Sequence, residues 1–153
     1  MIINQLWHYL QSAIGLILRH PVTGTSIIPI LPDGRIVLIR RRDTGQWGLP
    51  GGMVDWREDI PTTVKRELIE ETGLELQTLK RLVGVYSEPD RDPRFHSICV
   101  VVEAIVDGII NIQDTLEITD VQAFSPADID IHQLSYDHGR QLQDYLAGKT
   151  TLS

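Results

Sequence analysis

The first 20 residues carry apolar side chains at helical spacing, at Ile3, Leu6, Trp7, Leu10, Ile14 and Ile17. This spacing predicts an amphipathic helix over residues 1–20. Asn4, Gln5 and His8 interrupt the run, which is too short and too polar for a membrane span. It also lacks the basic start and the cleavage site of a secretion signal. We expect the helix to pack on the domain that follows, with a homodimer contact or peripheral membrane association as the alternatives.

From residue 21 to residue 153 the sequence predicts one domain. Apolar runs bounded by turn residues predict strands at 25–31, 35–41, 76–86, 97–107 and 121–124. Pro32, Asp33 and Gly34 separate the first two strands and predict a β-hairpin. Helical patterns cover 59–72 and 135–147. Strands before, between and after two helices indicate the α/β class, as a sandwich around a mixed sheet.

Composition supports a small globular protein and excludes some classes of function. The chain has 153 residues, of which 42% are hydrophobic and 23% are charged, and these values suit a single domain with one good core. The net charge of −7 and the lack of a broad basic surface argue against a nucleic-acid-binding protein. Cys99 is the only cysteine, so it cannot form an internal disulfide. We expect it to be buried, in a protein of the reducing cytoplasm.

Three glutamates share one face of the helix expected at 59–72. Glu67 and Glu71 lie one turn apart, with Glu70 beside them. Carboxylates this close repel one another unless a cation neutralises them. Mg²⁺ prefers oxygen ligands and is often shared with substrate phosphates, and Arg66 can pair with a glutamate and fix its direction. The alternative is a solvated acidic face without a metal.

Capping residues and a glycine-rich loop frame this helix. Asp59 is suited to cap its start, Pro61 falls in its first turn, and Gly73 is placed to end it. The segment 47–52 reads W-G-L-P-G-G, and its glycines let backbone approach a bound group closely. An ordinary tight turn between a strand and the helix is the alternative, and the two interpretations are compatible.

The segment 52–74 resembles the Nudix box, G-x5-E-x7-R-E-U-x-E-E-x-G-U, in which U is a bulky apolar residue. Every defined position matches, through Gly52, Glu58, Arg66, Glu67, Leu68, Glu70, Glu71, Gly73 and Leu74. The approach to the box, W-x-L-P-G-G, also resembles that of the family. The chain is therefore identified as resembling the Nudix hydrolases, and the resemblance implies an α/β/α sandwich with a mixed sheet.

The resemblance also implies a metal-dependent pyrophosphohydrolase. It assigns metal binding to Glu67, Glu70, Glu71 and a loop carbonyl of Gly51 or Gly52, with Mg²⁺ as the cofactor and Mn²⁺ as an alternative. The metal would neutralise the pyrophosphate oxygens and activate a water for attack on phosphorus. The catalytic set would comprise these glutamates, Arg66 and Glu117, with either a box glutamate or Glu117 as the general base. Glu58 would support the loop and the helix.

The loop 86–96 suggests the substrate. It resembles the matching loop of ADP-ribose pyrophosphatases, a Nudix subgroup with a proline about 16 residues beyond the box, and Pro89 lies 16 residues after Gly73. We expect Pro89, Arg91 and Arg94 to contact the substrate, with Phe95 or Tyr86 stacking on adenine. The alternative is a rigid surface loop with its own salt bridges.

Further arginines are candidates for phosphate contact. Arg40, Arg41 and Arg42 end a predicted strand just before the glycine loop, and we name Arg42 as the candidate among them. Arg57 stands where many family members have glycine, and it can either approach a phosphate or be tolerated without a role. Trp47 and Trp56, and likewise His96 and His138, are expected to be structural.

Three hypotheses follow for function. The first is hydrolysis of ADP-ribose or a similar nucleoside diphosphate linked to a sugar. The second is the same chemistry on nucleoside triphosphates or dinucleoside polyphosphates. The third is a nucleotide-sensing domain without turnover, which has no need of Glu67 and Glu71 together. The Pro89 loop favours the first hypothesis.

Overall fold

A central mixed sheet organises the computed structural model, which describes residues 9–10, 13 and 19–153. The strands are β1 (Val22–Ile30), β2 (Ile36–Arg41), β3 (Trp47–Gly48), β4 (Glu75–Tyr86), β5 (Ser97–Asp107), β6 (Ile118–Phe124) and β7 (Thr151–Leu152). They follow the order β3-β2-β1-β5-β4-β7, and β6 pairs with β2. The helix expected over residues 1–20 lies almost entirely outside the described residues.

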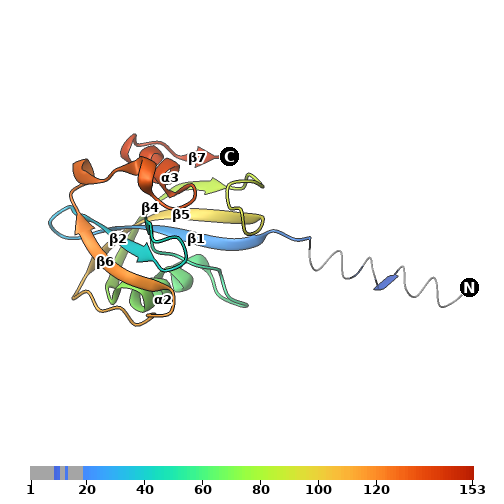
Figure 1. Cartoon of the computed structure of the whole chain (residues 1–153), viewed down its shortest axis with the longest axis horizontal. Helices are drawn as coiled ribbons and strands as arrows, with labels where there is room; N and C mark the ends of the chain where they lie inside the picture. The colour runs from blue at the N-terminus through green and yellow to red at the C-terminus, as the bar shows by residue number, and fades with distance from the viewer. Residues whose placement is uncertain (1–8, 11–12, 14–18) are drawn as a thin grey trace, which may run out of the picture.

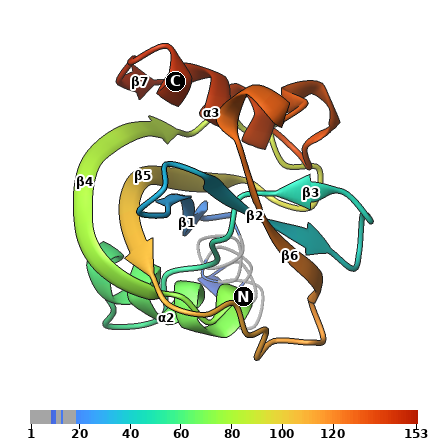
Figure 2. The ribbon, with the colours of Figure 1, turned by 90° about the vertical axis from the view of Figure 1, so that its left-hand side faces the viewer.

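The two α-helices cover opposite faces of the sheet. Helix α2 (Ile60–Thr72) packs one face, and α3 (His138–Leu146) packs the other together with the 3₁₀ turns η1 (Pro126–Asp128) and η2 (Ile131–Gln133) (Figures 1 and 2). Ile27 of β1 joins the core beneath α2, whereas its neighbour Ile28 joins the core beneath α3. Successive residues of a strand point to opposite faces, so β1 is apolar on both sides. This arrangement confirms the predicted α/β sandwich.

The predicted hairpin between the first two strands is confirmed as an antiparallel pair, but the pairing is much shorter than expected. Ile30 and Ile36 form the single paired position of β1 with β2, while β1 runs parallel to β5 from end to end. The reason is that the glycine loop takes the other edge of β1: the Ile27 N–H donates to the Pro50 carbonyl and the Thr25 N–H to the Gly52 carbonyl, both at 2.8 Å. β2 pairs instead with β6 in antiparallel register.

Helix α2 begins and ends as its sequence predicts. Oδ1 of Asp59 accepts a hydrogen bond from the Thr62 N–H at 2.9 Å, which satisfies one free donor of the first turn. At the other end Gly73 adopts the left-handed φ of 75°, which glycine reaches without steric cost. Val64 and Leu68 are fully buried. They fix which face of the helix carries the glutamates.

Helix α3 begins three residues later than predicted. Ser135 donates its N–H to the Trp47 carbonyl at 2.8 Å, and Tyr136 has a left-handed φ of 51°, so neither continues a right-handed helix. Periodicity did not predict β3 and β7, because each is only two residues long. Among the described residues no helix is long and apolar enough to cross a membrane.

Candidate active site

Helix α2 places Glu67 and Glu70 on the lining of a cavity, whereas Glu71 does not line it. Glu67 and Glu71 are almost completely buried, at 8% and 2% exposed, while the Glu70 side chain is 44% exposed. A buried carboxylate is costly unless it is paired or neutralised. This burial sets the first two glutamates apart from a solvated acidic face.

Arg66 links the glutamates to the loop before the helix. Its Nε and Nη2 donate to the two carboxylate oxygens of Glu58 at 2.9 and 3.0 Å, and its Nη1 donates to Glu67 at 2.7 Å and Glu70 at 3.3 Å. Nη2 also donates to the Met53 carbonyl. The Arg66 guanidinium holds the pKa of Glu58 down at about 2. One arginine thus fixes the directions of three carboxylates.

The glycine loop contacts the buried carboxylates directly. The Gly51 N–H donates to Oε2 of Glu71 at 2.8 Å. A Cβ added to Gly52 would lie 2.2 Å from Oε1 of Glu67, so only glycine allows that close approach. The Gly52 carbonyl accepts from the Thr25 N–H, whereas the Gly51 carbonyl accepts no hydrogen bond within residues 19–153. Both glycines therefore belong to the carboxylate site.

Burial raises the pKa of Glu71 well above its usual range, and the neighbouring Glu67 and Glu117 raise it further. Burial also raises the pKa of Glu67, although the nearby Arg66 acts to lower it. A hard divalent cation relieves this repulsion, and the donor set consists of oxygens alone, so these residues fit Mg²⁺. In the described residues no group of three or more His, Cys, Asp or Glu side chains is already arranged to hold a metal ion.

A pocket of about 400 Å³ opens between Glu67 and Glu70 and four other segments. Its α2 wall is formed by Arg66, Glu67 and Glu70, next to Gly51 and Gly52. The loops before β6 and before α3, the end of β2 and the 87–96 loop complete it through Glu117, Asp114, Tyr136, Asp137, His138, Arg41, Arg91, Asp92, Arg94 and Phe95. Glu117 thus lies on the pocket that the glutamates face.

The predicted substrate residues divide into two groups. Arg91 and Arg94 line the pocket, but Pro89, Arg57 and Arg42 do not. Arg42 instead donates to the Thr115 and Leu116 carbonyls at 2.9 and 3.1 Å. It thereby holds the segment that precedes Glu117, and Arg41 is the arginine of this run that reaches the pocket.

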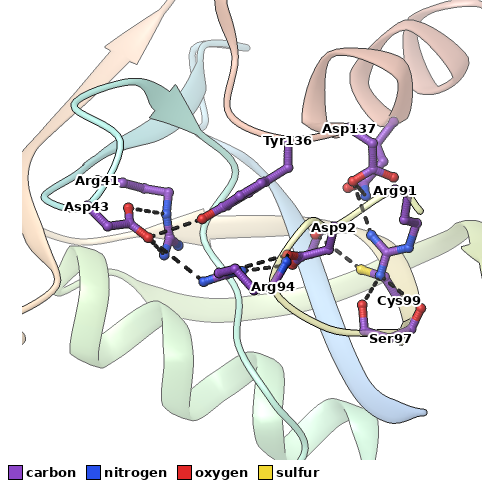
Figure 3. A network of polar contacts seen from close by, with 11 residues as sticks. Arg41, Asp43, Arg91, Asp92, Arg94, Ser97, Cys99, Tyr136 and Asp137 are labelled. Carbon is purple, nitrogen blue, oxygen red and sulfur yellow. Dashed lines mark hydrogen bonds and ion pairs between the residues drawn. The ribbon is translucent and has the colours of Figure 1, made fainter. Parts of the chain in front are cut away.

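Tyr86 and Arg91 have mainly internal contacts. The Tyr86 side chain is fully buried, and its hydroxyl donates to Asp144 at 2.8 Å, so the prediction that it stacks on adenine is wrong. The Arg91 side chain is 8% exposed and pairs with Asp137 at 3.1 Å (Figure 3). It also donates to Ser97. Arg91 ties the 87–96 loop to α3, while Phe95 is still exposed at the pocket.

Sequence reasoning missed the contribution of the segment before α3. Nδ1 of His138 accepts a hydrogen bond from the Leu49 N–H at 3.0 Å and so holds the glycine loop. Burial lowers the pKa of His138 to about 4, so the ring is neutral at pH 7. Tyr136 and Asp137 line the same pocket. No motif or period marks these residues, because their role depends on a contact across 89 positions of sequence.

The expected burial of Cys99 is confirmed. The side chain is 5% exposed, and its sulfur lies 3.3 Å from the Ser26 hydroxyl. Burial raises the pKa of the Cys99 thiol. A thiol kept protonated is a weak nucleophile, so Cys99 contributes packing to the pocket floor.

Comparisons with known proteins identify the family. The family model described as NUDIX domain matches residues 20–145. An ADP-ribose pyrophosphatase of Methanocaldococcus jannaschii is 36% identical over 135 residues, covering 85% of this chain and 76% of that protein. The crystal structure of a MutT NUDIX hydrolase from Burkholderia pseudomallei has a TM-score of 0.71 and 30% identity, covering 82% of this chain and 98% of that chain.

The fold also matches a domain with a bound nucleotide. The NUDIX domain of Shewanella oneidensis NrtR, solved in complex with ADP ribose, has a TM-score of 0.76 at 23% identity and covers 87% of this chain and 91% of that chain. The resemblance seen in residues 52–74 is confirmed. This chain belongs to the NUDIX domain family of hydrolases.

Proposed function

We propose that this protein hydrolyses the diphosphate of a nucleoside diphosphate linked to another group, and that ADP-ribose is the first candidate substrate. The observation that carries the proposal is one pocket with the carboxylates of Glu67 and Glu70 on one wall and the guanidinium groups of Arg41 and Arg94 on another. A diphosphate needs cationic partners on its oxygens. The relative from M. jannaschii carries the name ADP-ribose pyrophosphatase, which supports this choice of substrate.

Glu67, Glu70, Glu71 and a carbonyl of Gly51 or Gly52 would hold Mg²⁺, with Mn²⁺ as the alternative ion. When bound, the metal supplies positive charge beside the diphosphate oxygens and makes an attacking water more acidic. Arg66 keeps the Glu67 carboxylate directed while that ion binds, through the 2.7 Å hydrogen bond. Loss of this contact would loosen the whole carboxylate set.

The proton of the attacking water goes to a carboxylate of this chain. Glu117 is exposed on the loop before β6 and makes no hydrogen bond to Arg66, and we take it as the first candidate for the base. Water attack breaks one P–O bond of the diphosphate, so ADP-ribose and water would give AMP and ribose 5-phosphate. A Glu117→Gln variant tests this assignment, because it retains the side-chain volume and removes the base.

A substrate panel tests the proposal. The purified full chain is assayed with Mg²⁺, with Mn²⁺ and with a chelator against ADP-ribose, other nucleoside diphosphate sugars, dinucleoside polyphosphates and nucleoside triphosphates. We expect AMP from ADP-ribose, and no product with the chelator. Preference for triphosphates or dinucleoside polyphosphates would identify that class as the substrate in place of ADP-ribose. Tight nucleotide binding without turnover of any compound would favour a nucleotide-sensing role.

Assembly as a homodimer is a separate proposal. It comes from the apolar face expected within residues 1–20. Light scattering after gel filtration measures the mass of the full chain in solution. A mass of about twice the 17.3 kDa of one chain would support the dimer contact, and a monomer at micromolar concentration would favour packing of the helix on its own domain.

A further inference from the structure

Tyr136 stands in a backbone conformation that a tyrosine rarely adopts. It lies between η2 and α3 and has a φ of 51°. A left-handed residue other than glycine is strained, and such strain persists where the surrounding structure holds the residue in place. The Tyr136 side chain lines the same pocket as Glu67 and Glu70 of α2, and its contacts with neighbouring side chains hold the residue in this conformation.

The Tyr136 ring contacts two arginines from different segments. Cζ of Arg94, on the 87–96 loop, lies 4.4 Å from the ring centroid, and Cζ of Arg41, at the end of β2, lies 5.4 Å from it. The Tyr136 hydroxyl donates to Oδ2 of Asp43 at 3.1 Å. Figure 3 shows the ring reaching toward Arg41 and Asp43, with Arg94 close by. Cation–π contacts of this kind fix the guanidinium planes relative to the ring.

Both arginines are held by an aspartate in the same way. Nε and Nη2 of Arg41 donate to the two oxygens of Asp43, each at 2.9 Å, and Nε and Nη2 of Arg94 donate to the two oxygens of Asp92 at 3.1 and 2.9 Å. Within residues 19–153, Nη1 of each arginine makes no hydrogen bond, although Nη1 of Arg94 lies 3.8 Å from Oδ2 of Asp43 in an ion pair. A guanidinium has five N–H donors and each arginine uses two of them here, so three remain for another acceptor.

The charges of this group persist over a wide pH range. The Arg41 guanidinium holds the pKa of Asp43 at about 2. Burial acts to raise the pKa of Asp92, but hydrogen bonds from Arg94 outweigh it and lower that pKa. The aspartates therefore stay ionised and keep the arginines in place. The unused donors lie on the pocket that also holds the carboxylates, where an anion bridging the two walls would meet them.

We infer that Arg41 and Arg94 form a clamp for the substrate phosphate that lies farther from the carboxylates, and that Tyr136 is the positioning residue that sets its geometry. The inference rests on the proposed function for the identity of the substrate, but the clamp itself requires only a diphosphate. Tyr136 acts through the arginines, so its loss should weaken binding of the diphosphate and leave the rate of the bound substrate nearly unchanged.

Substitutions at Tyr136 test the clamp on the full chain. Tyr136→Leu removes the ring, and Tyr136→Phe removes only the hydrogen bond to Asp43. Tyr145→Leu is the matched control, because Tyr145 also stacks under an arginine, with Cζ of Arg81 at 5.3 Å, but lies outside the pocket lining. Thermal unfolding of each variant checks that it folds.

Two readouts separate the clamp from the proposed reaction. The first is kcat and KM for ADP-ribose with Mg²⁺, and the second is the Kd for inorganic pyrophosphate with Mg²⁺. For Tyr136→Leu we expect KM and Kd to rise roughly tenfold with kcat within about threefold, since two cation–π contacts are lost. Tyr136→Phe and Tyr145→Leu should change each value less than about threefold.

A double-mutant cycle tests whether Tyr136 acts through an arginine. Arg94→Met should raise the Kd for pyrophosphate, and adding Tyr136→Leu to it should raise the Kd by less than the product of the single effects. Independent, multiplying effects would overturn the positioning role.

The remaining outcomes are also decisive. Wild-type turnover with unchanged KM and Kd in Tyr136→Leu would overturn the clamp and leave the proposed function standing. Pyrophosphate binding that depends on Tyr136, without turnover of ADP-ribose, would support the clamp and overturn the proposed function. A loss of kcat at constant KM would also overturn the clamp.

Discussion

The Gly51 N–H donates to Oε2 of Glu71 across 2.8 Å and joins the glycine loop to helix α2. Within residues 19–153 this is the one hydrogen bond that the Glu71 carboxylate accepts, although the residue is only 2% exposed. A buried carboxylate with a single neutral donor is poorly compensated. Its surroundings therefore favour either a proton or a cation.

Replacing Glu71 should lower the activity but raise the stability of the fold. We expect Glu71→Gln to lose roughly a hundredfold or more in kcat, because several kcal/mol of metal-assisted stabilisation are removed. The same change should raise the free energy of unfolding by about 0.5–2 kcal/mol in a chelating buffer, since it removes a buried repelling charge. Denaturant unfolding with and without Mg²⁺ measures this gain. Full activity in the variant would refute the metal assignment.

The two loop glycines should fail in different ways. A Cβ on Gly51 would lie 2.1 Å from the Thr25 carbonyl oxygen, which is backbone and cannot move aside, whereas a Cβ on Gly52 would meet the end of the Glu67 side chain. We expect Gly51→Ala to lower the free energy of unfolding by about 2 kcal/mol or more. Gly52→Ala should retain most of its stability and raise the Mg²⁺ concentration needed for half-maximal activity roughly tenfold or more. Equal losses of stability would contradict this distinction.

His138 should make the fold sensitive to acid. Its pKa falls from 6.5 to about 4 on burial, so between these values the unfolded chain binds one more proton than the folded chain. The stability that the neutral ring contributes is complete above about pH 6.5 and is lost as the pH falls toward 4, by on the order of 3 kcal/mol.

Denaturant unfolding of the wild type and of His138→Asn between pH 4.5 and pH 7 measures this effect. The asparagine retains an acceptor for the Leu49 N–H and does not titrate, so the difference between the two proteins should narrow as the pH falls. Replacing the exposed His96 by Asn controls for the loss of a histidine. Parallel curves for the wild type and His138→Asn would contradict the prediction.

Arg57 should be a site of backbone strain with little effect on the substrate. Its φ is 69°, in the left-handed region that costs an L-residue about 1–2 kcal/mol, and it lies outside the pocket lining. We expect Arg57→Gly to stabilise the fold by about 0.5 kcal/mol, after the entropy cost of glycine, and Arg57→Val to destabilise it by about 1 kcal/mol. KM should change less than about twofold in both variants. A larger rise in KM would restore the predicted substrate contact.

Local sequence accounts well for helix α2 and its carboxylates. Asp59 and Gly73 bound the helix as predicted, and a spacing of three and four residues is enough to place Glu67, Glu70 and Glu71 together. The opposite apolar face then turns the glutamates toward the glycine loop. Strand β5 also agrees with its predicted range, because an apolar run of this length has no competing helical pattern.

The pairing of strands depends on contacts between distant segments, which local sequence patterns do not contain. The turn at Pro32–Gly34 predicted a hairpin, yet the glycine loop displaced β2 from β1 along most of its length. Arg42 was the arginine selected from sequence, but Arg41 reaches the pocket. Neighbouring strand residues point to opposite faces, so a shift of one position decides which arginine lines the pocket.

The sequence alone determined the family and predicted the metal-binding carboxylates and the kind of bond under attack, because these depend on residues within one helix turn or one loop. Only the tertiary structure placed Tyr136 between Arg41 and Arg94, and His138 against the glycine loop. These contacts join segments separated by up to 95 positions, from Arg41 to Tyr136, and no spacing along the chain encodes them. The carboxylate wall was thus accessible from local chemistry, while the opposite wall depended on how distant loops pack.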